Sequence, residues 1–425
     1  MKSLLEDWPY ALIQTGVFVF FVFLCRSAWD HQGRRQRHRL LSTLVWGAVF
    51  GFIIEALVVG GQNPSYTYAT DKFLSVLNVP IWVGLGWGMV AYGSIWTSDH
   101  LTFGLVRRAS ARSARSVPGT SAPLTANGPR WLLYVLRPIC AGFFAVSIDI
   151  LLDPVAHLMG FWTWKCDCEL LAQGPCPVPC PPDPPGQHHM LRFYDVPFDN
   201  FVGWFAITLT YAASSYAVAA GSLALRRWAR RKARLSGTKE KPFGARVALA
   251  LTEPWVTFLI VLPVVAGLFV AFYQFVFRNL ASWFYAGSTD DKEMCLFLFL
   301  FAVAGFVAAS HAVQTPRTGP IKKGVLFIPI FFQGMPLLFL VTRGFERQPN
   351  LLASAPSYLL MGFLLFWWPF LDTVIDYLAG VIRSLTGWSR LVLGLTVAAL
   401  LGLLLLFHPH TPAISVPRAL QALLP

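Results

Sequence analysis

The chain has 425 residues, of which 55% are hydrophobic and 13% are charged, and its formal net charge is +13. A soluble globular chain carries about 25% charged residues, so this composition excludes most soluble enzymes and all disordered or fibrous proteins. The lipid bilayer is therefore the expected solvent. In a membrane protein, an excess of Lys and Arg usually marks the cytoplasmic loops, so it first indicates the orientation in the membrane rather than a nucleic-acid partner.

Ten apolar runs along the chain are long enough to cross the hydrocarbon layer, which takes roughly 20 residues of helix. In chain order they lie at Pro9–Cys25, Leu40–Val59, Leu74–Thr97, Trp131–Val155, Phe201–Leu223, Val247–Phe277, Met294–Val313, Gly324–Val341, Leu351–Ile382 and Leu391–Phe407. The sequence thus predicts an all-α, polytopic membrane helix bundle. We expect a membrane domain at 1–223, a basic cytoplasmic linker at 224–246 and further membrane helices at 247–425.

The distribution of basic residues predicts the orientation, because cytoplasmic loops carry most Lys and Arg. With the N-terminus outside, the cytoplasmic loops hold 24 Lys and Arg, and the loops on the other side hold 9. This predicts a multi-pass plasma-membrane protein. The basic run 226–246 is expected to be a loop attracted to anionic lipid headgroups, with nucleic acid as a much weaker alternative. The Ser- and Pro-rich stretch 109–128 is expected to be disordered.

Four of the seven cysteines crowd into one predicted outer loop, 165–192. They are Cys166, Cys168, Cys176 and Cys180. Disulfides persist outside the cell, so two structural bridges are our main interpretation of these cysteines. A tetrahedral zinc site that also uses His188 and His189 is the alternative, although the spacing does not follow a common zinc-finger pattern.

Acidic residues inside the apolar runs are the most informative for chemistry. A charge at the centre of the bilayer costs about 2.5–3.5 kcal/mol on insertion scales, so such residues usually face a cavity. They are Glu55, Asp149, Asp153, Asp372 and Asp376. The spacing of each aspartate pair places both members on one helix face. Two carboxylates held close together share a proton, and a general acid needs that proton. Alternatively, each carboxylate reaches headgroup water at the end of its helix.

Aromatic residues crowd around the first three of these acids. The two outer loops read NPSYTYATDKF and GFWTW, and the following helix begins with RFYDVPFDNFVGW. The predicted substrate-binding residues are Tyr66, Tyr68, Trp162, Trp164, Tyr194, Asn200 and Trp204. Aromatic ring faces attract cations, so these rings suit a reaction that passes through a carbocation. An aromatic belt at the membrane interface would account for single rings.

The order of these motifs resembles the integral-membrane carotenoid biosynthesis family, which includes the carotenoid 1,2-hydratases. The resemblance covers about residues 40–222 and rests on Glu55 at a helix end, Tyr66 with Tyr68, VPIWVGLGW, D-x3-D-P from Asp149, GFWTW and YDVPFDNFVGW. The family's acidic positions correspond to Glu55, Asp149 and Asp153. Residues 166–191 and the helices after about residue 245 have no counterpart in that pattern.

The resemblance implies a hydratase, a hydro-lyase that adds water across a terminal double bond of an acyclic carotenoid. Asp149 or Asp153 would donate the proton, and Glu55 or the other aspartate would deprotonate the water. We expect no cofactor, because the chain lacks a dinucleotide-binding, P-loop or His-box motif. The expected partners are an apolar polyene from the bilayer and other enzymes of the pathway, with no nucleic acid and no metal.

Two other function classes remain open at this point. Ten spans, internal prolines and a second acidic pair, Asp372 and Asp376, are also typical of a proton-coupled transporter or lipid permease. The third class is a structural membrane protein of a pigment pathway, with its C-terminal helices as the contact surface.

Overall fold

A computed structural model of the chain describes residues 2–30, 34–61, 66–115, 130–164, 192–193, 196–235, 242–251, 323–344, 355 and isolated positions between 256 and 271. The helices are α1 (Lys2–Trp29), α2 (Arg34–Val59), α3 (Ile81–Arg115), α4 (Arg130–Leu158), α6 (Phe198–Leu235), α7 (Phe243–Leu251) and α11 (Lys323–Phe339), followed by the π-helical turn η2 (Leu340–Gly344). Short strands are β1 (Tyr66–Tyr68), β2 (Ser75–Val76), β3 (Val79–Pro80), β4 (Trp162–Trp164), β5 (Arg192–Phe193) and β6 (Val196–Pro197).

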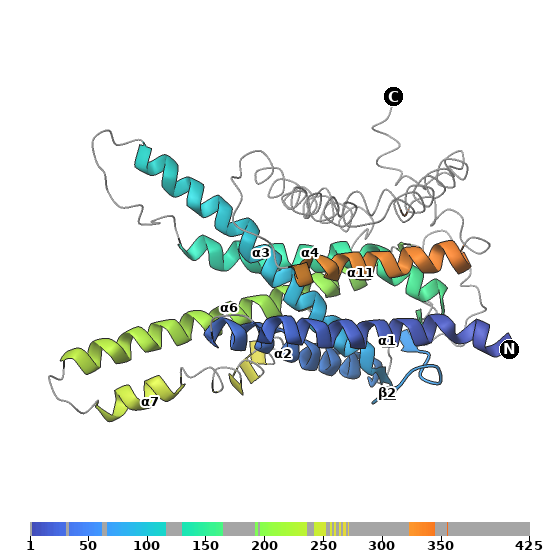
Figure 1. The fold of residues 1–425 in the computed structure, drawn as a ribbon, viewed down its shortest axis with the longest axis horizontal. Helices are drawn as coiled ribbons and strands as arrows, with labels where there is room; N and C mark the ends of the chain where they lie inside the picture. Colours follow the sequence, from blue (N-terminus) through green and yellow to red (C-terminus); the bar gives the residue numbers. More distant parts are fainter. Residues whose placement is uncertain are drawn as a thin grey trace, which may run out of the picture.

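The helices form an elongated bundle in which most run along the long axis and α3 crosses at an angle (Figure 1). Four described helices are long and apolar enough to span a membrane: Trp8–Trp29, Arg37–Val59, Tyr134–Leu158 and Asn200–Leu235. The predicted all-α membrane helix bundle is therefore confirmed. Apart from α11, the predicted spans after residue 247 lie largely outside the described residues, so their number stays a prediction.

Two helices extend beyond the predicted spans. Helix α3 continues to Arg115, so the first part of the stretch 109–128 is helical rather than disordered. Helix α6 continues to Leu235 and includes much of the basic run predicted to be a loop. Both extensions are rich in Ala, Arg and Leu, which are strong helix formers and need no bilayer to satisfy their backbone.

Helix α3 is the central helix, with contacts to α1, α2, α4, α6 and α11. It lies very close to α2, because glycines four residues apart face each other on the two helices. A Cβ atom added at Gly51 would lie 2.2 Å from the Cβ of Trp87, and one at Gly88 would lie 2.4 Å from the carbonyl oxygen of Leu44. This close approach seats the Trp87 side chain directly against α2.

A glycine turn ends α4 and directs the chain into β4. Gly160 has a φ of 72°, and the amide of Phe161 bonds back to the carbonyl of Ala156 at 2.9 Å. This is the Schellman arrangement of a helix C-terminus. Strand β4 then pairs antiparallel with β1. The aromatic motifs assigned to outer loops therefore form a short, ordered ribbon at one end of the bundle.

Candidate functional site

Glu55 lies in the last turns of α2, and its buried carboxylate accepts three hydrogen bonds. The hydroxyls of Tyr66 and Tyr68 both donate to Oε2, the latter at 2.7 Å. The indole Nε1 of Trp87 donates to Oε1 at 2.8 Å. A carboxylate offers only acceptor oxygens, so three donors satisfy the charged form and hold it in one orientation.

The two tyrosines reach Glu55 because they alternate along β1 and therefore point to the same face. Strand pairing sets Tyr66 opposite Trp164 and Tyr68 opposite Trp162, with ring centroids 4.7 Å and 5.8 Å apart. Burial and the nearby Glu55 charge raise the pKa of both tyrosine hydroxyls well above the usual value. Both hydroxyls thus stay protonated and remain donors.

Asp149 and Asp153 lie one turn apart on α4, and both are buried rather than extended toward the surface. The side-chain amide of Asn200, on α6, donates to Oδ2 of Asp149 at 3.0 Å and also to Oδ2 of Asp153. Oδ1 of Asp149 is buried and has no hydrogen-bond partner within the described part of the chain. One neutral amide therefore joins two carboxyl groups.

Glu55, Asp153 and Asn200 line one cavity with a volume of about 40 Å³, room for a few water molecules or the end of a chain. Its other lining residues are Tyr66, Tyr68, Trp82, Val83, Gly86, Trp87, Val90, Leu152, Trp162, Trp164, Trp204 and Phe332. Among the described residues, the lining includes no Lys, Arg or His. The cavity thus combines acids and aromatic rings without a neutralising cation.

The indole groups around this cavity offer both ring faces and N–H donors. The rings of Trp87 and Trp204 are in contact, with centroids 4.3 Å apart and planes tilted by 32°. The Nε1 atoms of Trp82, Trp162 and Trp164 are buried and have no hydrogen-bond partner in the described ranges. Unpaired donors of this kind favour an acceptor such as a water or hydroxyl oxygen.

A family model described as carotenoid biosynthesis protein matches residues 9–274, more than half of the chain. The chain belongs to this family. None of the curated proteins and none of the solved structures compared with it matches. The resemblance drawn from residues 40–222 is therefore confirmed, and the chain is a membrane protein of carotenoid biosynthesis. The match includes every residue that lines the cavity except Phe332.

The structure brings most of the predicted site residues of this carotenoid biosynthesis protein together. Six of the predicted substrate-binding residues line the cavity, namely Tyr66, Tyr68, Trp162, Trp164, Asn200 and Trp204. Asn200, a predicted substrate-binding residue, lines the cavity, and its side-chain amide bonds to the two aspartates. Tyr194, Asp372, Asp376 and the four loop cysteines lie outside the described residues.

Two important residues of the cavity were missed by the sequence analysis. Trp87 belongs to the motif VPIWVGLGW, but nothing in that motif indicates a hydrogen bond to an acid 32 positions earlier. Phe332 lies on α11, far along the chain, and the sequence carries no signal for it. In the described ranges, no group of three or more His, Cys, Asp and Glu side chains is arranged to hold a metal ion.

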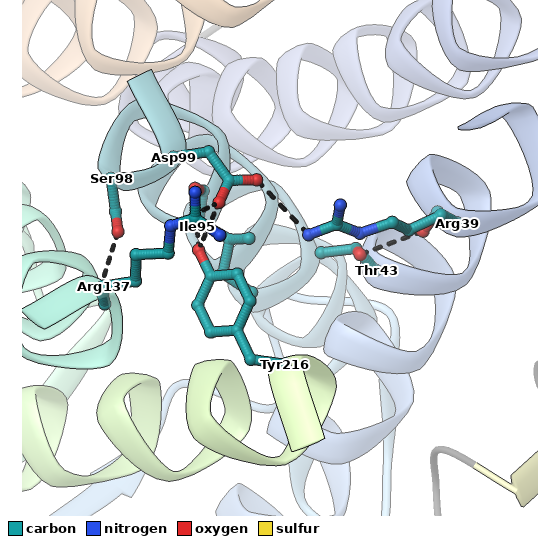
Figure 2. A network of polar contacts seen from close by, with 7 residues as sticks. All are labelled: Arg39, Thr43, Ile95, Ser98, Asp99, Arg137 and Tyr216. Atoms are coloured by element: carbon teal, nitrogen blue, oxygen red, sulfur yellow. Dashed lines mark hydrogen bonds and ion pairs between the residues drawn. The ribbon is translucent and has the colours of Figure 1, made fainter. Parts of the chain in front are cut away.

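A second polar cluster joins four helices around Asp99 of α3 (Figure 2). Its carboxylate pairs with Arg39 of α2 and Arg137 of α4, each at 3.3 Å, and accepts a hydrogen bond from Tyr216 of α6 at 3.0 Å. Both guanidinium groups also lie over the Tyr216 ring, 5.9 Å and 5.5 Å from its centroid. Here the carboxylate is fully neutralised, which indicates a structural role.

Proposed function

We propose that this protein hydrates a terminal double bond of an acyclic carotenoid by acid catalysis. One observation carries the proposal: Glu55 and Asp153 line one aromatic cavity, and Asn200 links Asp153 to the buried Asp149. Glu55 receives three donors, which suits an anion. Asp149 and Asp153 share one amide, and two such neighbours without a cation favour holding a proton between them.

In this mechanism the aspartate pair is the general acid. The proton moves from the pair to the less substituted carbon of the double bond, whose π electrons form the new C–H bond. The other carbon becomes a tertiary cation, which faces of rings such as Trp87 and Trp204 would stabilise. Water attacks that carbon, and its extra proton passes to Glu55 and from there back to the aspartates. The net reaction adds one water to the alkene.

The indole N–H groups and the apolar wall support the same reaction. The unpaired Nε1 atoms of Trp82, Trp162 and Trp164 would donate to the oxygen of the attacking water or of the alcohol product. Val83, Val90 and Leu152 would contact the hydrocarbon part of the substrate. An apolar polyene dissolves in the bilayer, so its end needs only to move sideways into the bundle.

We further propose that the cavity lies toward the outer side of the plasma membrane, with the N-terminus outside. The support is the excess of Lys and Arg in alternate loops and in the last part of α6. Glu55 and Arg39 lie near opposite ends of α2, so this orientation puts the Asp99 cluster on the cytoplasmic side. The same proposal includes other enzymes of the carotenoid pathway as neighbours in the membrane.

Pigment analysis tests the reaction directly. Expressed in a host that accumulates an acyclic carotenoid, the chain should yield a product whose mass is larger by one water. Asp153→Asn should lower that product by about 100-fold or more, the contribution typical of a general acid, at unchanged protein level. Asp71→Asn, at an exposed carboxylate, is the matched control and should retain the product.

Unchanged pigment despite good membrane expression would overturn the hydratase proposal. Proton-coupled uptake into vesicles, together with unchanged pigment, would favour the transporter class instead. Full product formation by both Asp149→Asn and Asp153→Asn would remove the aspartate pair from the mechanism and overturn the assignment of the acid.

A further inference from the structure

Helix α11 lies beyond the region matched by the family model, yet it packs into the bundle beside the cavity. It contacts α1, α3 and α4, and Figure 1 shows it (orange) running alongside α4. At its C-terminal end the Phe339 ring lies 5.7 Å from Trp8 and 5.6 Å from Phe161, next to the aromatic ribbon. The side-chain amide of Gln333 donates to the Ser147 carbonyl of α4 at 3.4 Å. These contacts hold α11 in a defined register.

Phe332 is the residue of α11 that lines the cavity. Its side chain is 2% exposed, and its ring lies against Gly86 of α3, where an added Cβ would come within 3.5 Å of Cζ. One turn earlier on α11, Ile328 lies against Gly93, where an added Cβ would come within 3.0 Å. Phe332 and Ile328 therefore fill successive levels of the groove along α3, with Phe332 next to the cavity.

The cavity lining has a polar part and an apolar part. Glu55, Asp153 and Asn200 supply the polar groups that would fix the reacting end of a chain. Phe332 contributes the part of the wall that comes from α11, beside Val83, Gly86 and Val90 of α3 and Leu152 of α4. With about 40 Å³ of open volume, the cavity admits only a short part of a chain before the wall is reached.

We propose that Phe332 limits how far an isoprenoid chain enters the cavity, so that α11 sets the chain length accepted by the site. This inference rests on the proposed function, because it takes the occupant to be the end of a polyene. It gives a helix outside the family match a role in substrate selection. Removal of the ring opens the groove at Gly86 as far as Ile328, and enlargement of the ring narrows the cavity.

Phe331 supplies a matched control for Phe332. It is the same residue type at the next position, but its ring packs 5.5 Å from Phe20 and against Gly16 of α1. It does not line the cavity. Phe331→Ala and Phe332→Ala thus remove the same ring from the same helix, and only the second change removes a residue that lines the cavity.

The test uses the purified full-length chain in lipid nanodiscs and parinaric acid, a conjugated polyene whose binding is followed by energy transfer from tryptophan. Competition with geraniol, farnesol and geranylgeraniol, which differ by one isoprene unit each, measures the accepted length. Each further buried methylene adds about fourfold in affinity, so we expect Phe332→Ala to favour the longest alcohol over the shortest by about tenfold more than wild type. Phe332→Leu should give an intermediate change in this preference, and Phe332→Trp should weaken the binding of all three alcohols. Phe331→Ala should bind the three alcohols with the same relative affinities as wild type.

The outcomes separate this inference from the proposed function. If wild type binds the probe and hydrates carotenoid, but the Phe332 variants rank the alcohols as Phe331→Ala does, the inference is overturned and the proposed function stands. If wild type neither binds the probe nor changes an acyclic carotenoid, the proposed function fails and the inference fails with it. Phe332→Leu, which keeps an apolar side chain of moderate size, guards against a result that reflects misfolding alone.

Discussion

The described part of the chain contains two clusters of buried or half-buried polar groups, and their contrast separates a structural role from a chemical one. Glu55 and Arg39 are both on α2, about 24 Å apart at 1.5 Å per residue, so the clusters lie near opposite ends of the bundle. The Asp99 cluster gives one carboxylate two guanidinium partners (Figure 2). The cavity gives its acids only neutral donors from Tyr, Trp and Asn side chains.

This difference indicates that buried acids in the bundle have two distinct roles, one in stability and one in chemistry. A carboxylate paired with arginines gains electrostatic energy and joins helices, so its loss should weaken the fold. Buried acids without a cation contribute little to stability and are retained where proton transfer needs them. The comparison predicts that stability and product formation respond in opposite ways at the two clusters.

The largest expected contrast comes from removal of one acid at each cluster. Asp99→Ala removes the carboxylate that pairs with two arginines and one of the two acceptors of the Tyr216 hydroxyl, and we expect it to lower the free energy of unfolding by about 2 kcal/mol. Asp149→Asn removes a buried charge and should leave the melting temperature unchanged or higher. Thermal unfolding in detergent, paired with pigment analysis per folded molecule, measures both. Equal destabilisation by the two changes would contradict the comparison.

A smaller effect is expected from single hydrogen-bond donors. Tyr68→Phe removes one of three donors to Glu55, so product formation should fall about fivefold, the value of one hydrogen bond of about 1 kcal/mol. Tyr211→Phe is the control, because its buried hydroxyl donates to the Thr43 carbonyl at 2.8 Å, away from the cavity. That control should lower the melting temperature and leave product formation per folded molecule unchanged. The reverse pattern would show that Glu55 is structural.

The smallest expected effects on stability come from removing single arginines, and they should decrease as the exposure of the arginine side chain increases. The Arg137 side chain is 19% exposed, Arg39 is 40% exposed and Arg26, paired with Asp30, is 75% exposed. We expect Arg137→Gln to cost about 1 kcal/mol, Arg39→Gln about half as much and Arg26→Gln close to nothing, because water screens exposed pairs. Melting temperatures at low and high salt measure the series. A larger loss for Arg26→Gln than for Arg137→Gln would refute this ranking.

Part of the site was predictable because it depends on local pattern. Tyr66 with Tyr68, and Trp162 with Trp164, alternate in sequence, so each pair shares one face of an extended segment. Asp149 and Asp153 share a helix face for the same kind of reason. Trp87, within the motif VPIWVGLGW, was not predicted as a site residue, since periodicity does not distinguish a ring that fills the core from one that donates to a buried acid.

By itself, the sequence determined that the chain is a helical membrane bundle of the carotenoid biosynthesis family with acids inside its apolar runs. Composition and short-range periodicity carry that information, because each helix satisfies its own backbone in lipid. Only the tertiary structure decided which donors meet which acid and that α11 completes the cavity wall. One such contact joins Asn200 of α6 to Asp149 of α4, 51 positions apart. Another joins Trp87 to Glu55, across the close approach of α2 and α3 at Gly51. Packing of distant helices sets such distances, and no local pattern records them.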